Sequence, residues 1–474
     1  MNKWLMLFLG GWIFFAGCQK ISVTEIQNMV DRGEFSKAEQ IIKERLADDK
    51  NLSAKEKDLL RFELERMKRI RKDFTKSREQ VVEFIKKYIP DVSDEDLARW
   101  EKEKKLEFMV IDGQKKYFNH AARNLFRLDD ECLAIWKQKN PDNKKKFDLD
   151  LHIENLIAEC QESGLTYGHP VRLRIKQGVV VHADQVPDGE LIRCWIPFPR
   201  EIPHRQLNIK ILNSEPKTYQ LAPNSRLQRT IYFEKQAIAN EPTEFWVEYE
   251  YTTHGVYVDI DPQKVKAVDP EGPLKEYLQE RPPHIVFSDT LKKLSAQIVG
   301  QETNPYRIAQ KIFAWIDTNI TWASAREYST IRNLSLYPVL NKHGDCGIQT
   351  MLFITLCRMN GIPARWQSGW EFQPPDDSMH DWSMIYFEPY GWVPSDVTYG
   401  MRQSDVPQVK YFYLNGMDSF RLIFNDDYSM PFEPPKTHFR SETVDSQRGE
   451  VEWDGGNLYF DQWDWKFEWK IISQ

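Results

Sequence analysis

The chain has 474 residues, of which 41% are hydrophobic and 13% aromatic, and its formal net charge is −7. This length predicts two to four domains, and the apolar content is enough for real hydrophobic cores. The slightly acidic balance gives no basic surface for nucleic acid, so we expect no nucleic acid partner.

The first eighteen residues have the pattern of a targeting segment. Lys3 precedes an apolar run that is too short to span a membrane comfortably, and the run ends in small residues before Cys18. Phe15-Ala-Gly-Cys18 resembles a bacterial lipobox, with Phe15 in place of the usual leucine. The resemblance implies that Cys18 is lipidated and becomes the mature N-terminus. We therefore expect a protein of the bacterial cell envelope, bound to the membrane through its lipid anchor.

The remaining cysteines fit an oxidising compartment in which at least one thiol stays free to react. Besides Cys18 there are five, an odd number: Cys132, Cys160, Cys194, Cys346 and Cys357. The sequence indicates no disulfide framework, and it leaves a single Cys132–Cys160 bond open.

Residues 19–165 follow helical spacing. Apolar residues recur on both sides of Gly33, which predicts a helical hairpin similar to a tetratricopeptide unit, and residues 59–78 predict a charged amphipathic helix. Residues 108–117 predict a short hairpin. Because charge runs are typical of solvent-facing helices, a helical spacer above the membrane is favoured over a platform for a partner.

Residues 166–260 change to short alternating runs, such as 171–176 and 244–251, separated by proline, glycine and asparagine turns. Several short strands at this spacing predict a β-sandwich domain. A proline-rich linker at 261–283 then leads into a core expected at 284–400, which begins with helices at 290–299 and 306–320.

Three residues of this core have complementary chemistry. The apolar spacing after Cys346 predicts a helix that ends at Gly361, with Asp345 as its N-cap, while His380 and Asp396 fall on strand-like runs that follow. A thiolate needs a neighbouring base, and an imidazole needs a third group to orient it. At a helix tip the unpaired N–H groups favour an anion, so we expect the Cys346 thiol to ionise easily.

A simpler interpretation exists for each of these residues taken alone. A buried cysteine often packs as a small hydrophobe, and a lone histidine beside tryptophan is usually a core residue. The catalytic interpretation is favoured because all three residues occur together.

The surrounding motifs are Gly344-Asp-Cys-Gly, His380-Asp-Trp and Gly391-Trp-Val-Pro-Ser-Asp396, and in this order they resemble the transglutaminase-like superfamily over residues 289–399. The resemblance implies a papain-like core with Cys346 as nucleophile, His380 as base and acid, and Asp396 as the orienting group. Residues 195–200 resemble the β-domain that often precedes such cores in bacteria. The expected fold is α+β and multidomain, a papain-like core preceded by a β-sandwich and a helical region.

An acyl-transfer site also needs donors for the developing oxyanion. The Cys346 backbone N–H is one, and the resembling family implies a side chain upstream of the nucleophile as another. Trp322 and Tyr328 are candidates, although packing is the commoner role of such residues. No calcium loop is recognisable, so no metal and no cofactor are expected.

Residues 401–474 are expected to form an aromatic-rich β extension at the C-terminus. Strand-like alternation at 463–471 places a row of aromatic side chains on one face: Trp463, Trp465, Phe467 and Trp469. Such a row could stack on sugars or peptides, but burial against the β-domain or the core is favoured.

The expected reaction is acyl transfer from an amide to a thiol and then to water, which makes the protein a cysteine hydrolase, a peptidase or amidase, acting on a protein or peptide. One alternative is a transglutaminase that crosslinks proteins. Another is a non-catalytic lipoprotein that binds peptide or glycan in the same cleft.

Overall fold

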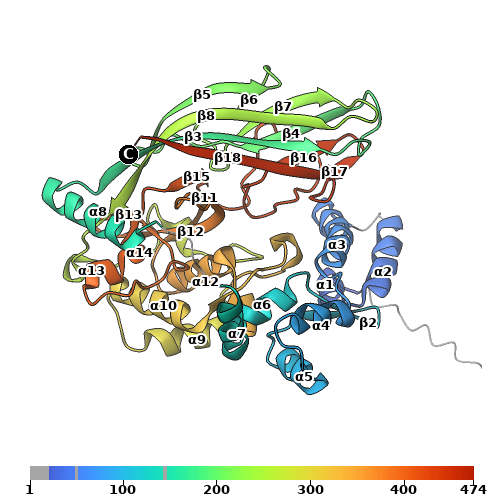
Figure 1. Ribbon diagram of the computed structural model, residues 1–474, viewed down its shortest axis with the longest axis horizontal. Helices are drawn as coiled ribbons and strands as arrows, with labels where there is room; N and C mark the ends of the chain where they lie inside the picture. The colour runs from blue at the N-terminus through green and yellow to red at the C-terminus, as the bar shows by residue number, and fades with distance from the viewer. Residues whose placement is uncertain (1–20, 49–51, 142–146, 474) are drawn as a thin grey trace, which may run out of the picture.

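The computed structural model describes residues 21–48, 52–141 and 147–473. Figure 1 shows a mixed core of helices and strands, a layer of long strands along one side of it, and a group of short helices at one end. Cys18 and the predicted targeting segment lie outside the described residues, so the lipid anchor stays a prediction. Within the described ranges, no helix combines the length and the apolarity that crossing a bilayer requires.

The N-terminal region is a group of short helices around its own hydrophobic core. Serine hydroxyls cap four of them: Ser22, Ser53, Ser77 and Ser93 each accept the backbone N–H three residues ahead. Its elements are α1 (Val23–Asp31), α2 (Phe35–Ala47), α3 (Ala54–Asp73), α4 (Arg78–Lys86), α5 (Asp94–Lys102), the hairpin β1 (Phe108–Ile111) and β2 (Gln114–Tyr117), α6 (Ala121–Leu128) and α7 (Asp130–Lys139).

This region is docked on the core, which differs from the solvated spacer that its charge runs favoured. Asn124 and Ser324 exchange two hydrogen bonds of 2.8 and 3.0 Å, and the Thr330 hydroxyl donates to the Asp73 carboxylate at 3.0 Å. The charged surface of α3 concealed a buried apolar stripe: Leu60, Met67 and Ile70. On the core side, these contacts are made by residues 324–330, which lead into the site described below.

Two five-stranded sheets form the layer of long strands, and their inner faces share one hydrophobic core. One sheet has the order β14-β8-β3-β18, with β5 also paired to β8, and the other has the order β17-β16-β4-β7-β6. The strands are β3 (Tyr167–Val181), β4 (Leu191–Pro197), β5 (Gln206–Glu215), β6 (Gln220–Leu221), β7 (Thr230–Gln236), β8 (Thr243–Tyr257), β14 (Gly416–Met417), β16 (Glu450–Trp453), β17 (Gly456–Leu458) and β18 (Trp463–Ser473).

The C-terminal residues do not form a separate extension. Strands β14, β16, β17 and β18 complete the two sheets above, while β15 (Arg421–Asn425) joins the sheet of the core. Side chains of the predicted aromatic row pack against aromatic residues of the core. Phe467 stacks on Trp370 at 3.8 Å between ring centroids, and Trp469 packs on Phe372. Local alternation predicted strands in this region, but their pairing partners lie far away in the sequence and could not be inferred from it.

The core is a four-stranded sheet, β13-β12-β11-β15, packed against helices. The strands are β11 (Ala364–Glu371), β12 (Ser378–Phe387) and β13 (Gly391–Ser395). The helices are α8 (Leu149–Ser163), α9 (Asp289–Val299), α10 (Pro305–Asn319), α11 (Tyr337–Asn341), α12 (Cys346–Met359), α13 (Pro407–Lys410) and α14 (Phe412–Asn415), and the short strands β9 (Thr321–Trp322) and β10 (His343–Gly344) pair in parallel. Residues of α12 from 347 to 358 are buried, which explains its nearly continuous apolar sequence.

The described cysteines are all free thiols. Cys132 lies in the N-terminal hydrophobic core and Cys160 in the hydrophobic core beside the four-stranded sheet, so the disulfide that the sequence left open does not form. Cys346 is partly exposed, whereas the other four are buried.

Candidate active site

Cys346 is the first residue of α12, as its sequence predicts. The Asp345 carboxylate caps the helix by accepting the backbone N–H of Ile348 at 3.1 Å. Gly347 follows because a side chain would not fit: a Cβ at this position would lie 2.1 Å from the Tyr328 hydroxyl oxygen. The helix tip and the Tyr328 side chain therefore meet at the nucleophile position.

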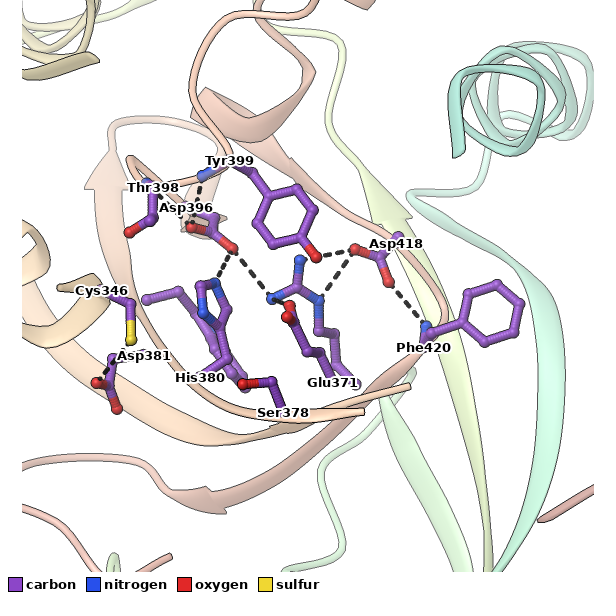
Figure 2. Close-up of polar contacts among 12 residues, drawn as sticks. Cys346, Glu371, Ser378, His380, Asp381, Asp396, Thr398, Tyr399, Asp418 and Phe420 are labelled. Atoms are coloured by element: carbon purple, nitrogen blue, oxygen red, sulfur yellow. Dashed lines mark hydrogen bonds and ion pairs between the residues drawn. The ribbon is translucent and has the colours of Figure 1, made fainter. Parts of the chain in front are cut away.

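His380 and Asp396 are brought together by two adjacent antiparallel strands, β12 and the end of β13. His380 Nε2 donates to Asp396 Oδ2 at 2.7 Å, and the exposed fractions of the two side chains are 6% and 0%. Further hydrogen bonds fix the Asp396 carboxylate. Its Oδ1 accepts the backbone N–H groups of Thr398 and Tyr399 (Figure 2), and its Oδ2 also accepts a hydrogen bond from Arg421 Nη1 at 3.0 Å. The carboxylate therefore has little freedom to turn.

This pair favours an imidazolium beside a carboxylate. Burial alone favours the neutral imidazole, but the carboxylates of Asp396 and Glu371 outweigh it and raise the pKa of His380. Burial likewise opposes a charged Asp396, yet His380 and Arg421 lower the pKa of that carboxyl below its usual value. The neutral imidazole can take a proton at Nδ1, and the neighbouring carboxylate stabilises the resulting imidazolium until the proton is returned.

The thiol of Cys346 does not point at this pair in the structure. Its sulfur donates to Asp381 Oδ2 at 3.2 Å, and Figure 2 shows it turned toward that carboxyl group. Tyr328 also binds here, with its hydroxyl 3.0 Å from both Asp381 Oδ2 and Asp345 Oδ1. The structure thus joins His380 to Asp396 and places Cys346 nearby with a different hydrogen-bond partner.

The expectation that Cys346 ionises easily is wrong for this arrangement. Burial and the carboxyl groups of Asp381 and Asp345 raise the pKa of the thiol well above its usual value. The helix N-terminus is present, but two carboxyl groups and desolvation outweigh its dipole. The sequence predicted Asp345 only as the helix cap. Asp381 follows His380 in the sequence, and no local pattern indicates that its carboxyl group approaches the Cys346 thiol.

We expect Asp381→Asn to make the Cys346 thiol more acidic, because Asp381 and the thiol compete for ionisation at this distance and the amide removes that competition. The alkylation rate of Cys346 by iodoacetamide should then rise at lower pH than in the wild-type protein. Peptide mass mapping over a pH series measures this rate site by site. Cys357 serves as the internal control: it is fully buried, and burial raises its pKa, so it should stay unmodified in both proteins. An unchanged pH profile would show that Asp381 does not control the thiol.

The two oxyanion candidates differ in whether their donor group already has a hydrogen-bond partner. The Tyr328 hydroxyl has one proton and lies between two carboxyl groups, so it is already engaged. Trp322 lines the same pocket as Cys346, is 41% exposed, and lies against the guanidinium of Arg127 at 4.8 Å. Its side chain is the freer of the two.

Two further residues of the site were missed from the sequence. Arg421, on β15, is fully buried and bridges Asp396 to Asp418, whose Oδ2 lies 2.8 Å from Arg421 Nη2. Both lie beyond the motif that carries His380 and Asp396, and only the pairing of β15 with β11 brings them close. The pattern that could have indicated them is an aspartate and an arginine three residues apart in an apolar stretch, which is typical of a buried ion pair.

Residues 292–397 match the family model of the transglutaminase-like superfamily. No curated protein is similar to the chain. Among solved structures, a "Putative Cysteine Protease from Cytophaga hutchinsonii" shares 16% identity over 65% of this chain and 93% of its own, with a TM-score of 0.44. The periplasmic domain of TgpA from Pseudomonas aeruginosa shares 12% identity over 48% of this chain and 88% of its own, with a TM-score of 0.25.

The family match spans the helix that begins with Cys346, the strand with His380 and the turn with Asp396. The match and the fold of these elements support a cysteine-dependent kind of enzyme. Residues 292–397 of this chain are therefore a domain of the transglutaminase-like superfamily.

Proposed function

We propose that the chain is an extracytoplasmic, lipid-anchored cysteine hydrolase that cleaves amide or peptide bonds by acyl transfer. Cys346 is the nucleophile, His380 the base and acid, and Asp396 the group that orients His380. The observation that carries the proposal is the buried 2.7 Å contact between His380 Nε2 and Asp396 Oδ2, because His380 lies on β12, which packs against the helix that begins with Cys346. A triad is recognised by such geometry and by the roles it permits.

The reaction requires the thiol to turn from Asp381 to His380 by rotation about its Cα–Cβ bond. Asp396 occupies Nε2, so Nδ1 is the nitrogen that takes the thiol proton. The sulfur attacks the amide carbon, and His380 passes the proton to the amine as the C–N bond breaks. Water then attacks the thioester, which releases the acid and restores the thiol.

Peptide-amide substrates with a fluorogenic leaving group test this proposal directly. Intact-mass measurement during turnover should detect an acyl-thioenzyme on the wild-type protein, and released carboxylic acid should match released amine. Added alkylamines separate the alternatives: products that carry the added amine in place of acid would favour the crosslinking transglutaminase. Binding without any acyl-enzyme or turnover would favour the non-catalytic lipoprotein.

Trp322→Phe should lower kcat by about 10²-fold with little change in KM, because it removes an indole N–H but keeps an aromatic ring, and loss of one oxyanion donor has an effect of this order. Steady-state kinetics on the same substrate measures it. Trp465→Phe is the matched control, since Trp465 is similarly exposed (42%) but lies on β18, away from the Cys346 pocket. Full activity of Trp322→Phe would remove Trp322 from the mechanism.

The lipid anchor is tested by Cys18→Ser, which should yield an unlipidated protein because the acyl chains require the cysteine sulfur. Labelled palmitate incorporation and partition between membrane and soluble fractions measure the outcome. A variant that still carries labelled lipid and sediments with membranes would contradict the anchor.

A further inference from the structure

Beside the Cys346 thiol lies a pocket of about 250 Å³ whose wall is unusually rich in carboxyl groups. They come from four separate stretches of the chain: Glu327, Asp345, Asp381, Glu442 and Asp445. Figure 2 shows the Asp381 carboxyl group directly beneath the Cys346 sulfur. A group bound in this pocket would therefore sit next to the reacting atoms.

Nearby cations neutralise only part of this charge. Arg448 pairs with Glu327 at 2.9 Å and with Glu442 at 2.7 Å, so its guanidinium is fully engaged. Within the described part of the chain, no lysine, arginine or histidine forms an ion pair with Asp345, Asp381 or Asp445. Three carboxyl groups at the nucleophile are thus left without an ion pair, and the Arg448 and Arg440 guanidiniums act on Asp445 only through space.

Asp445 gives an independent indication that the pocket accepts a donor group. Only 4% of its surface is exposed, and no described donor reaches its Oδ2 atom, although it lines the pocket. A buried carboxylate oxygen without a donor is costly, so such an atom calls for an explanation. The neighbouring carboxyl group of Asp381 cannot satisfy it without an extra proton.

The hydrogen bonds also require that protons are held in this cluster. Tyr328 has a single hydroxyl proton but contacts carboxyl oxygens of both Asp345 and Asp381, so one of those two groups must carry a proton. In agreement, burial raises the pKa of Asp345 to about 7, and burial with Asp445 and Asp345 raises the pKa of Asp381 well above its usual value. A cation bound in the pocket would stabilise the ionised carboxylates, so its binding would displace these protons.

We propose that the pocket is a subsite for a cationic group of the substrate, an ammonium or a guanidinium, held by Asp445, Asp381 and Asp345 next to the bond that Cys346 attacks. This inference rests on the proposed hydrolase function and gives its substrate class. Within the described residues, no three His, Cys, Asp or Glu side chains are arranged to hold a metal ion, and an organic cation is the occupant to test first.

Binding is measured on the Cys346→Ala variant, so that turnover does not interfere. The probe is 4,4,4-trifluorobutylammonium, followed by fluorine NMR, with 4,4,4-trifluorobutanol as the uncharged analogue. The ammonium should bind at least about tenfold more tightly than the alcohol, and Asp445→Asn should weaken ammonium binding by about tenfold or more. Because the cation replaces protons, its binding near neutral pH should release protons, which calorimetry in buffers of different ionisation enthalpy detects.

Asp464→Asn is the matched control, since Asp464 is an exposed carboxylate on β18 that pairs with His182, and its loss changes net charge equally. Equal binding of ammonium and alcohol, equal weakening by both variants, or occupancy by calcium chloride but not by the ammonium would each overturn the subsite. Ammonium binding without any acyl-enzyme on the wild-type protein would instead leave the subsite standing and overturn the hydrolase. Equal kcat/KM for lysine-containing and norleucine-containing peptides would show that the substrate charge is not recognised.

Discussion

Cys346→Ala should abolish acyl-enzyme formation and lower kcat by a factor on the order of 10⁴–10⁶, the scale found when the nucleophile of a triad is removed. Alanine keeps the backbone N–H at the helix tip and removes only the sulfur, which makes a hydrogen bond to Asp381 alone. The fold should therefore be retained, with a free energy of unfolding within about 1 kcal/mol of the wild-type value. Intact-mass trapping and kinetics on the fluorogenic amides measure the two effects.

Cys357→Ala is the matched control for this substitution. Cys357 lies on the same helix and is fully buried, so its loss creates a small cavity but removes no group from the site. Its kcat should be unchanged, although its stability should fall more than that of Cys346→Ala. Substantial turnover by Cys346→Ala, or equal loss of turnover in both variants, would contradict Cys346 as the nucleophile.

The elements that carry the three proposed catalytic residues were predictable because each is marked by a local pattern. Asp345 caps a helix whose apolar run ends before Gly361, and the alternating runs with His380 and Asp396 are separated by short turns. Adjacent strands joined by a short turn pair with each other, so the meeting of His380 with Asp396 could be expected from spacing.

The direction of the Cys346 side chain could not be expected in the same way. It depends on Asp381, Tyr328 and the buried segment that contains Asp445, and these approach the helix tip through contacts over long sequence separations. The sequence argument counted the helix dipole and the histidine, which both favour a thiolate. It omitted desolvation and the carboxyl groups, which together have the larger effect on the thiol pKa.

Arg421 was unpredictable for a related reason. A fully buried arginine is rare and stable only when paired, and its partners Asp396 and Asp418 lie on different segments. Its role becomes visible only when β15, assigned from the sequence to a C-terminal extension, takes its place beside β11. The C-terminal residues therefore complete the site as well as the two sheets of the β-layer.

Arg421 also determines what a substitution of Asp396 does. In Asp396→Asn, the backbone N–H groups of Thr398 and Tyr399 require an acceptor at the Oδ1 position, so the amide oxygen lies there. The amide NH₂ must then take the Oδ2 position, facing both His380 Nε2 and the Arg421 guanidinium. His380 would have to accept at Nε2, and its proton would move to Nδ1.

A neutral imidazole protonated at Nδ1 cannot take the thiol proton through that nitrogen. We therefore expect Asp396→Asn to lower kcat by a factor on the order of 10²–10⁴, as in other triads whose histidine is held in the wrong tautomer. Nitrogen NMR of labelled histidine identifies the tautomer, and kinetics on the fluorogenic amides gives kcat. Asp464→Asn is the control, because it changes a histidine–aspartate contact of 3.0 Å at the surface, between His182 and Asp464. Wild-type kcat in Asp396→Asn, or an unchanged His380 tautomer accompanied by a large loss of activity, would contradict the orienting role of Asp396.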